Sequence, residues 1–189
     1  MKLLHLSDLH LGKAIGNYSL IEDQKYCLKQ ILEIIKKRNV DVIMIAGDIF
    51  DTQISSVEAL TLYSDFIEEI IFKMGKIVLA ISGNHDSAKR LDVNSKFYKA
   101  NNYHLFGEFK DEIISLKDEY GIINFHLIPF ISLNQGKILF DENIENYTDI
   151  YKKILEKRKL KDRNVLISHC YANKYAIEEE NAYNLGQKP

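Results

Sequence analysis

Cysteine, proline and tryptophan are scarce in this sequence of 189 residues, which has two cysteines, two prolines and no tryptophan. Two cysteines cannot build a disulfide framework, and so low a number indicates a reducing compartment. Two prolines and nine glycines exclude a collagen-like or low-complexity chain. We therefore expect an ordinary folded protein of the cytoplasm.

Long apolar runs are also missing. The longest, such as Val42–Ala46 and Ile77–Ile81, have five residues, whereas a membrane span needs about 20. The amino terminus lacks the apolar stretch and the small-residue cleavage site of a signal peptide. The sequence predicts no contact with a membrane.

An excess of charge of either sign is the third absence, because 25 basic and 27 acidic residues leave a net charge of -2. This balance excludes a protein that binds nucleic acid by bulk charge alone, but not a nuclease, since metal ions supply positive charge that a side-chain count misses. One basic cluster, residues 152–163, holds seven cations in twelve residues. A solvated helix face explains it better than a phosphate-binding surface.

What is present is an alternation of short apolar segments and helical stripes. Strands are expected at residues 2–7, 40–46 and 76–82, with helices at 20–38, 56–74 and 87–100. This order predicts an α/β fold with a parallel sheet in one domain. Further strands at residues 103–106, 112–116 and 122–130 are expected to form a second sheet, followed by a helix at 144–160 and a strand at 164–168.

Four of these strands end in polar residues suited to metal binding: Asp8 and His10, then Gly47-Asp48, then Gly83-Asn84-His85-Asp86, and last His169. In open α/β sheets, ligands bind beyond the carboxyl ends of the strands, so these groups should converge in space. Singly, each has an ordinary explanation as a turn, cap or surface residue. Their mixed oxygen and nitrogen donors suit manganese, iron or zinc better than calcium, and a closed structural zinc site would use cysteine.

These motifs resemble the calcineurin-like metallophosphoesterases. Residues 7–12 (SDLHLG), 46–51 (AGDIFD) and 83–87 (GNHDS), with the Ile-Pro-Phe at 128–130, are similar to the SbcD-type nucleases within that family. The resemblance covers essentially the whole chain. It implies an α/β/β/α sandwich, DNA as the substrate, an SbcC-like ATPase as the partner, a homodimer, and a role in DNA repair, recombination and replication.

The resemblance also implies a role for individual residues. Asp8 and His10 would hold a first divalent metal ion, Asn84 and His169 a second, and Asp48 would bridge the two. The metal would be manganese, with iron or zinc as alternatives. His85 would not be a ligand but would act as general acid toward the departing sugar oxygen. Asp51 corresponds to an aspartate that orients the catalytic histidine in related phosphatases.

The sequence departs from the family pattern at its carboxyl end. Residues 1–189 are expected to form a metallophosphoesterase domain that stops before a final Gly-His-x-His signature and before a cap domain, and that holds five of seven expected ligands. Residues 170–189 are polar and show no period. On this basis we expect the 189-residue chain to bind one metal well and to cleave DNA poorly.

Two other functions remain open at this point. One is a phosphoesterase that acts on a small nucleotide or on a phosphoprotein. The other is a non-catalytic fragment that dimerises through the helices at residues 56–74 and 87–100. Cleavage assays on several substrates separate the two enzymes, and a metal titration with a mass measurement identifies the fragment.

Overall fold

The protein is described by a computed structural model that covers residues 1–158, 160 and 162–170. Most of the aperiodic segment 170–189, and positions 159 and 161 of the basic cluster, lie outside these residues. The strands are β1 (Leu3–Leu6), β2 (Ala14–Ile15), β3 (Tyr18–Ser19), β4 (Val42–Ala46), β5 (Ile77–Ile81), β6 (Tyr103–Phe106), β7 (Ile113–Asp118), β8 (Gly121–Ile128) and β9 (Asn164–Ser168). The helices are α1 (Ile21–Arg38), α2 (Val57–Glu68), the π-helical turn η1 (Glu69–Lys73), α3 (Ala88–Asp92), α4 (Ser95–Lys99), α5 (Leu133–Leu139) and α6 (Tyr147–Lys157).

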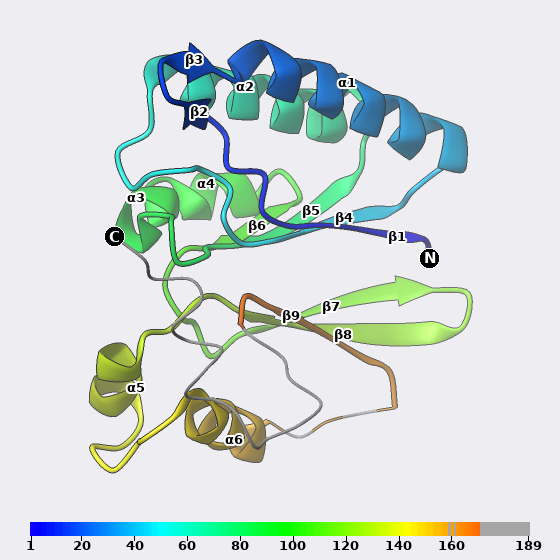
Figure 1. The fold of residues 1–189 in the computed structure, drawn as a ribbon. Helices are drawn as coiled ribbons and strands as arrows, with labels where there is room; N and C mark the ends of the chain where they lie inside the picture. Colours follow the sequence, from blue (N-terminus) through cyan, green and yellow to red (C-terminus); the bar gives the residue numbers. More distant parts are fainter. Residues whose placement is uncertain (159, 161, 171–189) are drawn as a thin grey trace.

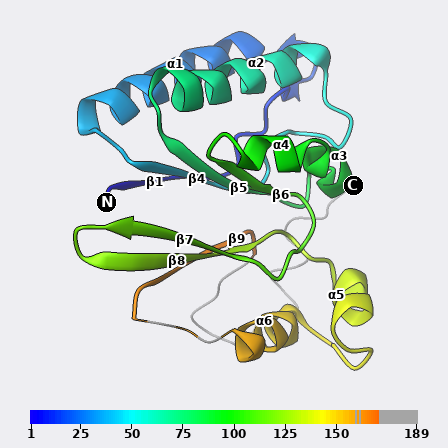
Figure 2. The same ribbon diagram turned by 180° about the vertical axis from the view of Figure 1, so that it is seen from behind.

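The layers follow the order helix, sheet, sheet, helix (Figure 1). The first sheet is parallel with the strand order β1-β4-β5-β6, and α1 and α2 cover its outer face. The second sheet, β7-β8-β9, lies against the inner face, and α5 and α6 lie on its far side (Figure 2). The predicted α/β/β/α sandwich is therefore confirmed.

Burial on both faces explains the unbroken apolar run of β4. Ile43 and Ile45 pack into the core under α1 and α2, whereas Met44 and Ala46 pack into the core between the two sheets. A strand covered on both sides needs no polar alternation. A third apolar cluster, around Ile150 and others, joins α5 and α6 to the lower sheet.

The membership of the two sheets differs from the prediction. The strand at residues 103–106 does not belong to the second sheet, because β6 pairs in parallel with β5 and extends the first. The strand that ends before His169 pairs with β8, so it belongs to the second sheet. Apolar strands look alike in a sequence, and long-range packing decides which of them pair.

The helix boundaries also differ in places. Ser56 caps α2 as predicted, accepting a hydrogen bond from the Ala59 N–H, but the helix tightens its end into η1. The segment 87–100 forms two short helices, because Asn94 between them has a φ of 66°. The β2–β3 hairpin and α5 were not predicted, although the capping box of Ser132 and Gln135 marks the start of α5. In the part of the chain described, every helix is too short or too polar to cross a membrane.

Candidate metal centre

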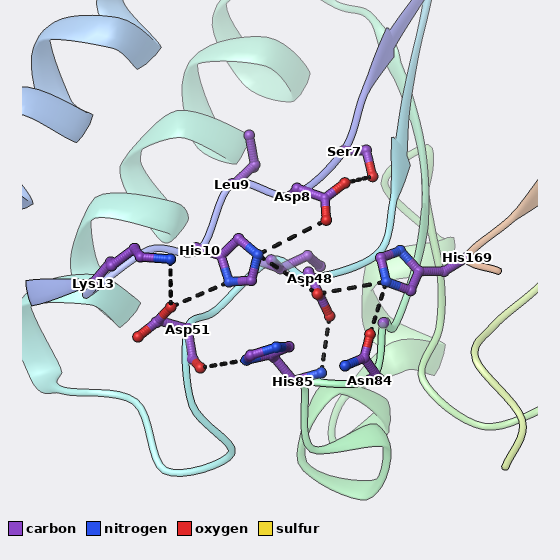
Figure 3. A network of polar contacts seen from close by, with 12 residues as sticks. Ser7, Asp8, Leu9, His10, Lys13, Asp48, Asp51, Asn84, His85 and His169 are labelled. Atoms are coloured by element: carbon purple, nitrogen blue, oxygen red, sulfur yellow. Dashed lines mark hydrogen bonds and ion pairs between the residues drawn. The ribbon is translucent and has the colours of Figure 1, made fainter. Parts of the chain in front are cut away.

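Polar side chains from four strand ends meet at one edge of the two sheets (Figure 3). They are Asp8 and His10 after β1, Asp48 after β4, Asn84 and His85 after β5, and His169 after β9. Three of these strands belong to the first sheet and one to the second. The site is therefore shared by the two sheets, rather than lying at the edge of one open sheet as expected.

The backbone beyond β1 and β4 continues the pairing of these strands. The Asp8 N–H donates to the Gly47 carbonyl at 3.1 Å, and the His10 N–H donates to the Asp48 carbonyl at 3.0 Å. Asp8, His10 and Asp48 have positive φ angles of 57°, 43° and 51°. Residues other than glycine rarely adopt this conformation, and its presence at three neighbouring positions is typical of a functional site.

A glutamine of α1 holds the loop that carries His10. The Gln24 Nε2 donates to the His10 carbonyl at 2.7 Å, and its Oε1 accepts from the Gly12 N–H at 3.0 Å. One side chain thus satisfies a donor and an acceptor of the irregular backbone on either side of the turn. This contact helps to keep His10 in its unusual conformation.

Two glycines make room for the functional side chains. A Cβ on Gly47 would lie 2.5 Å from His169 Nδ1, and a Cβ on Gly83 would lie 2.1 Å from Asp48 Oδ1. Gly47 also has a φ of 88°. Any side chain at either position would displace a proposed ligand, which gives the two glycine motifs a steric reason.

Asp48 occupies the centre of the site. Its carboxylate is 4% exposed, and its Oδ2 lies 3.6 Å from His10 Nε2 and 3.5 Å from His169 Nε2. Its Oδ1 accepts from the His85 N–H at 2.9 Å. Burial alone would raise the pKa of Asp48, but hydrogen bonds from His169 and from the His85 backbone, with the nearby positive charge, lower it overall. The carboxylate is therefore charged and faces both sides of the site.

The first side brings together three electron-pair donors. His10 Nε2 lies 3.8 Å from Asp8 Oδ1 and 3.6 Å from Asp48 Oδ2, and these three residues form a group that could hold a metal ion. Ligands bonded at about 2.0–2.2 Å to one ion lie roughly 3.0–3.6 Å apart, so the observed spacing is close to that of a coordination shell. Ser7 supports the arrangement, since its hydroxyl contacts Asp8 Oδ2 and lies 3.1 Å from the Ala46 carbonyl.

The second side has the same character. His169 Nδ1 lies 2.8 Å from the Ala46 carbonyl, which can only accept, so this nitrogen carries the proton and donates. His169 Nε2 then faces Asn84 Oδ1 at 3.1 Å and Asp48 Oδ2 at 3.5 Å. Burial opposes the charged imidazole, but the contact with Asp48 raises the pKa of His169 overall. A proton or a metal cation on Nε2 satisfies these converging acceptors, and the donor set fits a divalent metal.

Comparison with known proteins agrees with this geometry. The calcineurin-like phosphoesterase family model matches residues 1–189. The chain belongs to the calcineurin-like phosphoesterases. Proteins of this family use divalent metals, and the aspartate and histidine groups described above are where this member could hold them.

Two relatives of this phosphoesterase share most of its length. It is 32% identical over 156 residues to the SbcD component of the nuclease SbcCD from Staphylococcus saprophyticus, which is 82% of this chain and 41% of the relative. It is 34% identical over 176 residues to the same component from Staphylococcus epidermidis, which is 89% of this chain and 46% of the relative. The chain thus spans less than half the length of these curated relatives.

His85 and Asp51 lie beside the metal ligands, but not in the arrangement expected. The Asp51 carboxylate does not contact the His85 ring; its Oδ1 lies 3.2 Å from His10 Nδ1. His85 Nδ1 instead contacts the backbone carbonyl of Asp51 at 3.0 Å. The His10 and His85 rings meet edge to face with their centroids 4.8 Å apart. His85 is exposed at the mouth of the site, where a substrate can reach it.

Asp86 supports the phosphoesterase site without facing it. Its buried carboxylate accepts from the N–H groups of Ile49, Phe50 and Gly83 at 2.8–3.1 Å. Burial raises its pKa, although these hydrogen bonds act against the shift. Asp86 ties the loop after β4 to the loop after β5, a role that was not predicted although the residue stands within the Gly-Asn-His-Asp motif.

The remaining histidines lie in strands as predicted, and structural roles suit them. His126 is 2% exposed and hydrogen-bonds to Asn164 and Arg158. His5 is exposed on β1, and His104 is partly buried on β6. Of the basic cluster, Arg158 is buried rather than solvated, and Arg163 pairs with Asp118.

Proposed function

We propose that this chain is the catalytic part of a metal-dependent phosphodiesterase that cleaves DNA, as the nuclease component of an SbcCD-type complex. The observation that carries the proposal is the position of Asp48. Its Oδ2 lies at nearly equal distance from His10 Nε2 and His169 Nε2, at 3.6 Å and 3.5 Å. One carboxylate between two imidazoles suits the binding of a pair of cations.

Each ion would have its own residues. Asp8 and His10 would hold the first, Asn84 and His169 the second, and Asp48 would contribute to both. Two divalent ions, with manganese as the first choice and iron or zinc as alternatives, would supply an acidified water and neutralise the phosphate charge. His10 and His169 each offer Nε2 to the site, since Asp51 and the Ala46 carbonyl lie at their Nδ1 atoms.

His85 would handle the proton of the leaving group. The Asp51 carbonyl accepts a hydrogen bond from Nδ1–H, which leaves Nε2 of the exposed ring free to face a substrate. A protonated imidazole can donate from Nε2 to the sugar oxygen as its bond to phosphorus breaks. The carbonyl at 3.0 Å stabilises that charged form and fixes the direction of the ring.

The choice of DNA, of an SbcC-like ATPase partner and of a role in DNA repair and recombination rests on the relatives, which are the SbcD components of SbcCD nucleases. The net charge of -2 makes the positive charge of bound metal the main attraction for a phosphate backbone. A phosphoesterase for small nucleotides would use the same metal chemistry. The identity of the substrate is therefore the point that needs an experiment.

A homodimer is the second part of the proposal. An apolar groove runs between α2–η1 and α3–α4, with Tyr63 and Ile67 in its lining. Phe72 and Phe97 also line it and are 68% and 74% exposed. Exposed apolar surface of this kind marks an interaction site, and a second copy of the chain would bring the same surface to cover it.

The substrate is tested by parallel cleavage assays with manganese. Single-stranded DNA, linear duplex DNA and a chromogenic phosphodiester are offered to the chain and to the same chain with His85→Ala. Manganese-dependent cleavage of DNA that is lost with chelator and reduced in the variant supports a nuclease. Cleavage of the chromogenic ester with no action on either DNA favours the small-substrate phosphoesterase.

A further inference from the structure

Asp51 contacts both histidines of the site through different atoms. Its carboxylate Oδ1 lies 3.2 Å from His10 Nδ1, and its backbone carbonyl lies 3.0 Å from His85 Nδ1. The two contacts are independent, because a substitution of the side chain removes the first and leaves the carbonyl of the second. Figure 3 shows the residue between the two rings.

The contact with His10 concerns the nitrogen opposite the metal-facing one. Nδ1 of this ring is buried and has no aligned hydrogen-bond partner among the described residues, although Asp51 Oδ1 is within 3.2 Å. Nε2 on the other side of the ring faces Asp8 and Asp48. A histidine that binds a cation through Nε2 keeps its proton on Nδ1, and that proton needs an acceptor. A small rotation of either side chain aligns Asp51 for this role.

Lys13 is the other charged group near this carboxylate. Its Nζ lies 3.8 Å from Asp51 Oδ1, and its side chain is 48% exposed. It keeps Asp51 close to a positive charge on the solvent side, whereas His10 lies on the inner side. An exposed pair of this kind contributes little energy, so Lys13 serves as a control for charge around Asp51.

We propose that Asp51 is a positioning residue for His10: its carboxylate accepts the Nδ1 proton and presents Nε2 to the metal, while only its backbone orients His85. This inference rests on the proposed metal function. It differs from the family expectation, in which the carboxylate at this position acts on the catalytic histidine. Outer carboxylates that hydrogen-bond to a metal-binding histidine typically change metal affinity by about 10–100-fold when they are removed.

The test compares metal affinity with cleavage in three variants of the 189-residue chain. Asp51→Ala should weaken manganese binding, measured by calorimetry, by about 10–100-fold. Asp51→Asn keeps an acceptor oxygen but no charge, and should lie between the variant with alanine and the unaltered chain. Lys13→Ala should bind manganese as the unaltered chain does. Unfolding curves in chelator establish that each variant is folded.

A second measurement reads the proton on the ring directly. In the zinc-loaded chain, nitrogen-15 NMR of the His10 ring, assigned with a His10→Gln variant, should show a protonated Nδ1 and a metal-bound Nε2. In Asp51→Ala the Nδ1 proton signal should exchange faster with water. A His10 ring bound through Nδ1, or unchanged manganese affinity in a folded Asp51→Ala chain, overturns the inference.

The two proposals fail in distinguishable ways. If the unaltered chain binds no manganese, the metal function itself is wrong. If it binds manganese and Asp51→Ala binds it equally well, only the role of Asp51 is wrong. At saturating manganese, any DNA cleavage by the unaltered chain should persist in Asp51→Ala, whereas a loss of cleavage with intact metal binding would show that the carboxylate acts on His85.

Discussion

His85 and Asp48 lie 2.9 Å apart through a backbone hydrogen bond, but their side chains have different tasks in the proposed reaction. The imidazole of His85 is exposed, whereas the carboxylate of Asp48 is 4% exposed. One is placed to meet a substrate and the other to hold cations. Substitutions should therefore separate cleavage from metal binding.

His85→Ala should leave manganese stoichiometry and affinity unchanged and reduce phosphodiester cleavage by roughly 10²–10⁴, the usual range for a positioned acid. The Asp48 contact survives, because it uses the backbone N–H of residue 85. Calorimetry and a cleavage assay on the same preparation make the comparison. Loss of the metal in this variant would mean that His85 is a ligand.

Asp48→Asn should have the opposite signature. A neutral amide cannot serve two cations, so manganese affinity should fall by at least about 10–100-fold, the range that follows the loss of outer-shell partners alone. Asp23→Asn, an exposed carboxylate in the first turn of α1, is the matched control and should bind as the unaltered chain does. Equal affinities in the two variants would refute the bridging role.

The strand-end motifs predicted these residues because chemistry and position coincide in the sequence. Asp8, His10, Asp48, Asn84 and His169 do come together, although their role as ligands stays a prediction. The direction of the Asp51 carboxylate could not be predicted, since it depends on whether a side chain leans toward one of two nearby histidines. The supporting roles of Gln24 and Asp86 depend on contacts between distant segments and leave no local signal.

At the scale of elements, β9 matters because it carries His169 into the site from the second sheet. Arg163, directly before β9, donates to both oxygens of Asp118 at the end of β7, at 2.6 Å and 3.0 Å. Such a two-point contact fixes the edges of this sheet relative to each other. The pair lies far along the chain from the catalytic motifs, yet it helps to anchor the strand that delivers a ligand.

Asp118→Asn should lower the stability of the apo chain in a pH-dependent way. The hydrogen bonds from Arg163 hold the pKa of Asp118 well below its usual range. The stabilising contribution is therefore fully present above about pH 4 and is lost as the pH falls through the lower native pKa. Thermal unfolding should show a lower midpoint for the variant at pH 7 and a difference that narrows toward acid.

Glu119→Gln, the exposed neighbouring carboxylate, controls for the general effect of charge and should leave the midpoint nearly unchanged. A difference between Asp118→Asn and the unaltered chain that stays constant or grows as the pH falls would contradict the assignment. The strand positions themselves followed from the apolar pattern of the sequence. The partner of each strand did not, because β6 and β9 have no local feature that distinguishes one sheet from the other.

At the scale of the whole molecule, the groove beside α2 and α4 predicts self-association. Phe97→Glu places a charge in the exposed apolar surface and should convert a dimer to a monomer in light scattering. Ile138→Glu is the control, since Ile138 is 84% exposed on α5, on the opposite layer. A monomeric unaltered chain, or a Phe97→Glu chain that remains dimeric, would show that the groove does not join two copies.

The central claim is that the site binds divalent cations on both sides of Asp48, and a crystal structure with manganese tests it most directly. Anomalous scattering should show a peak within roughly 2.0–2.3 Å of Asp8, His10 and Asp48. A second peak should lie on the side of Asn84 and His169, at lower occupancy if that side binds more weakly. Manganese bound elsewhere, with neither position showing a peak in a chain that binds the ion in solution, would contradict the account.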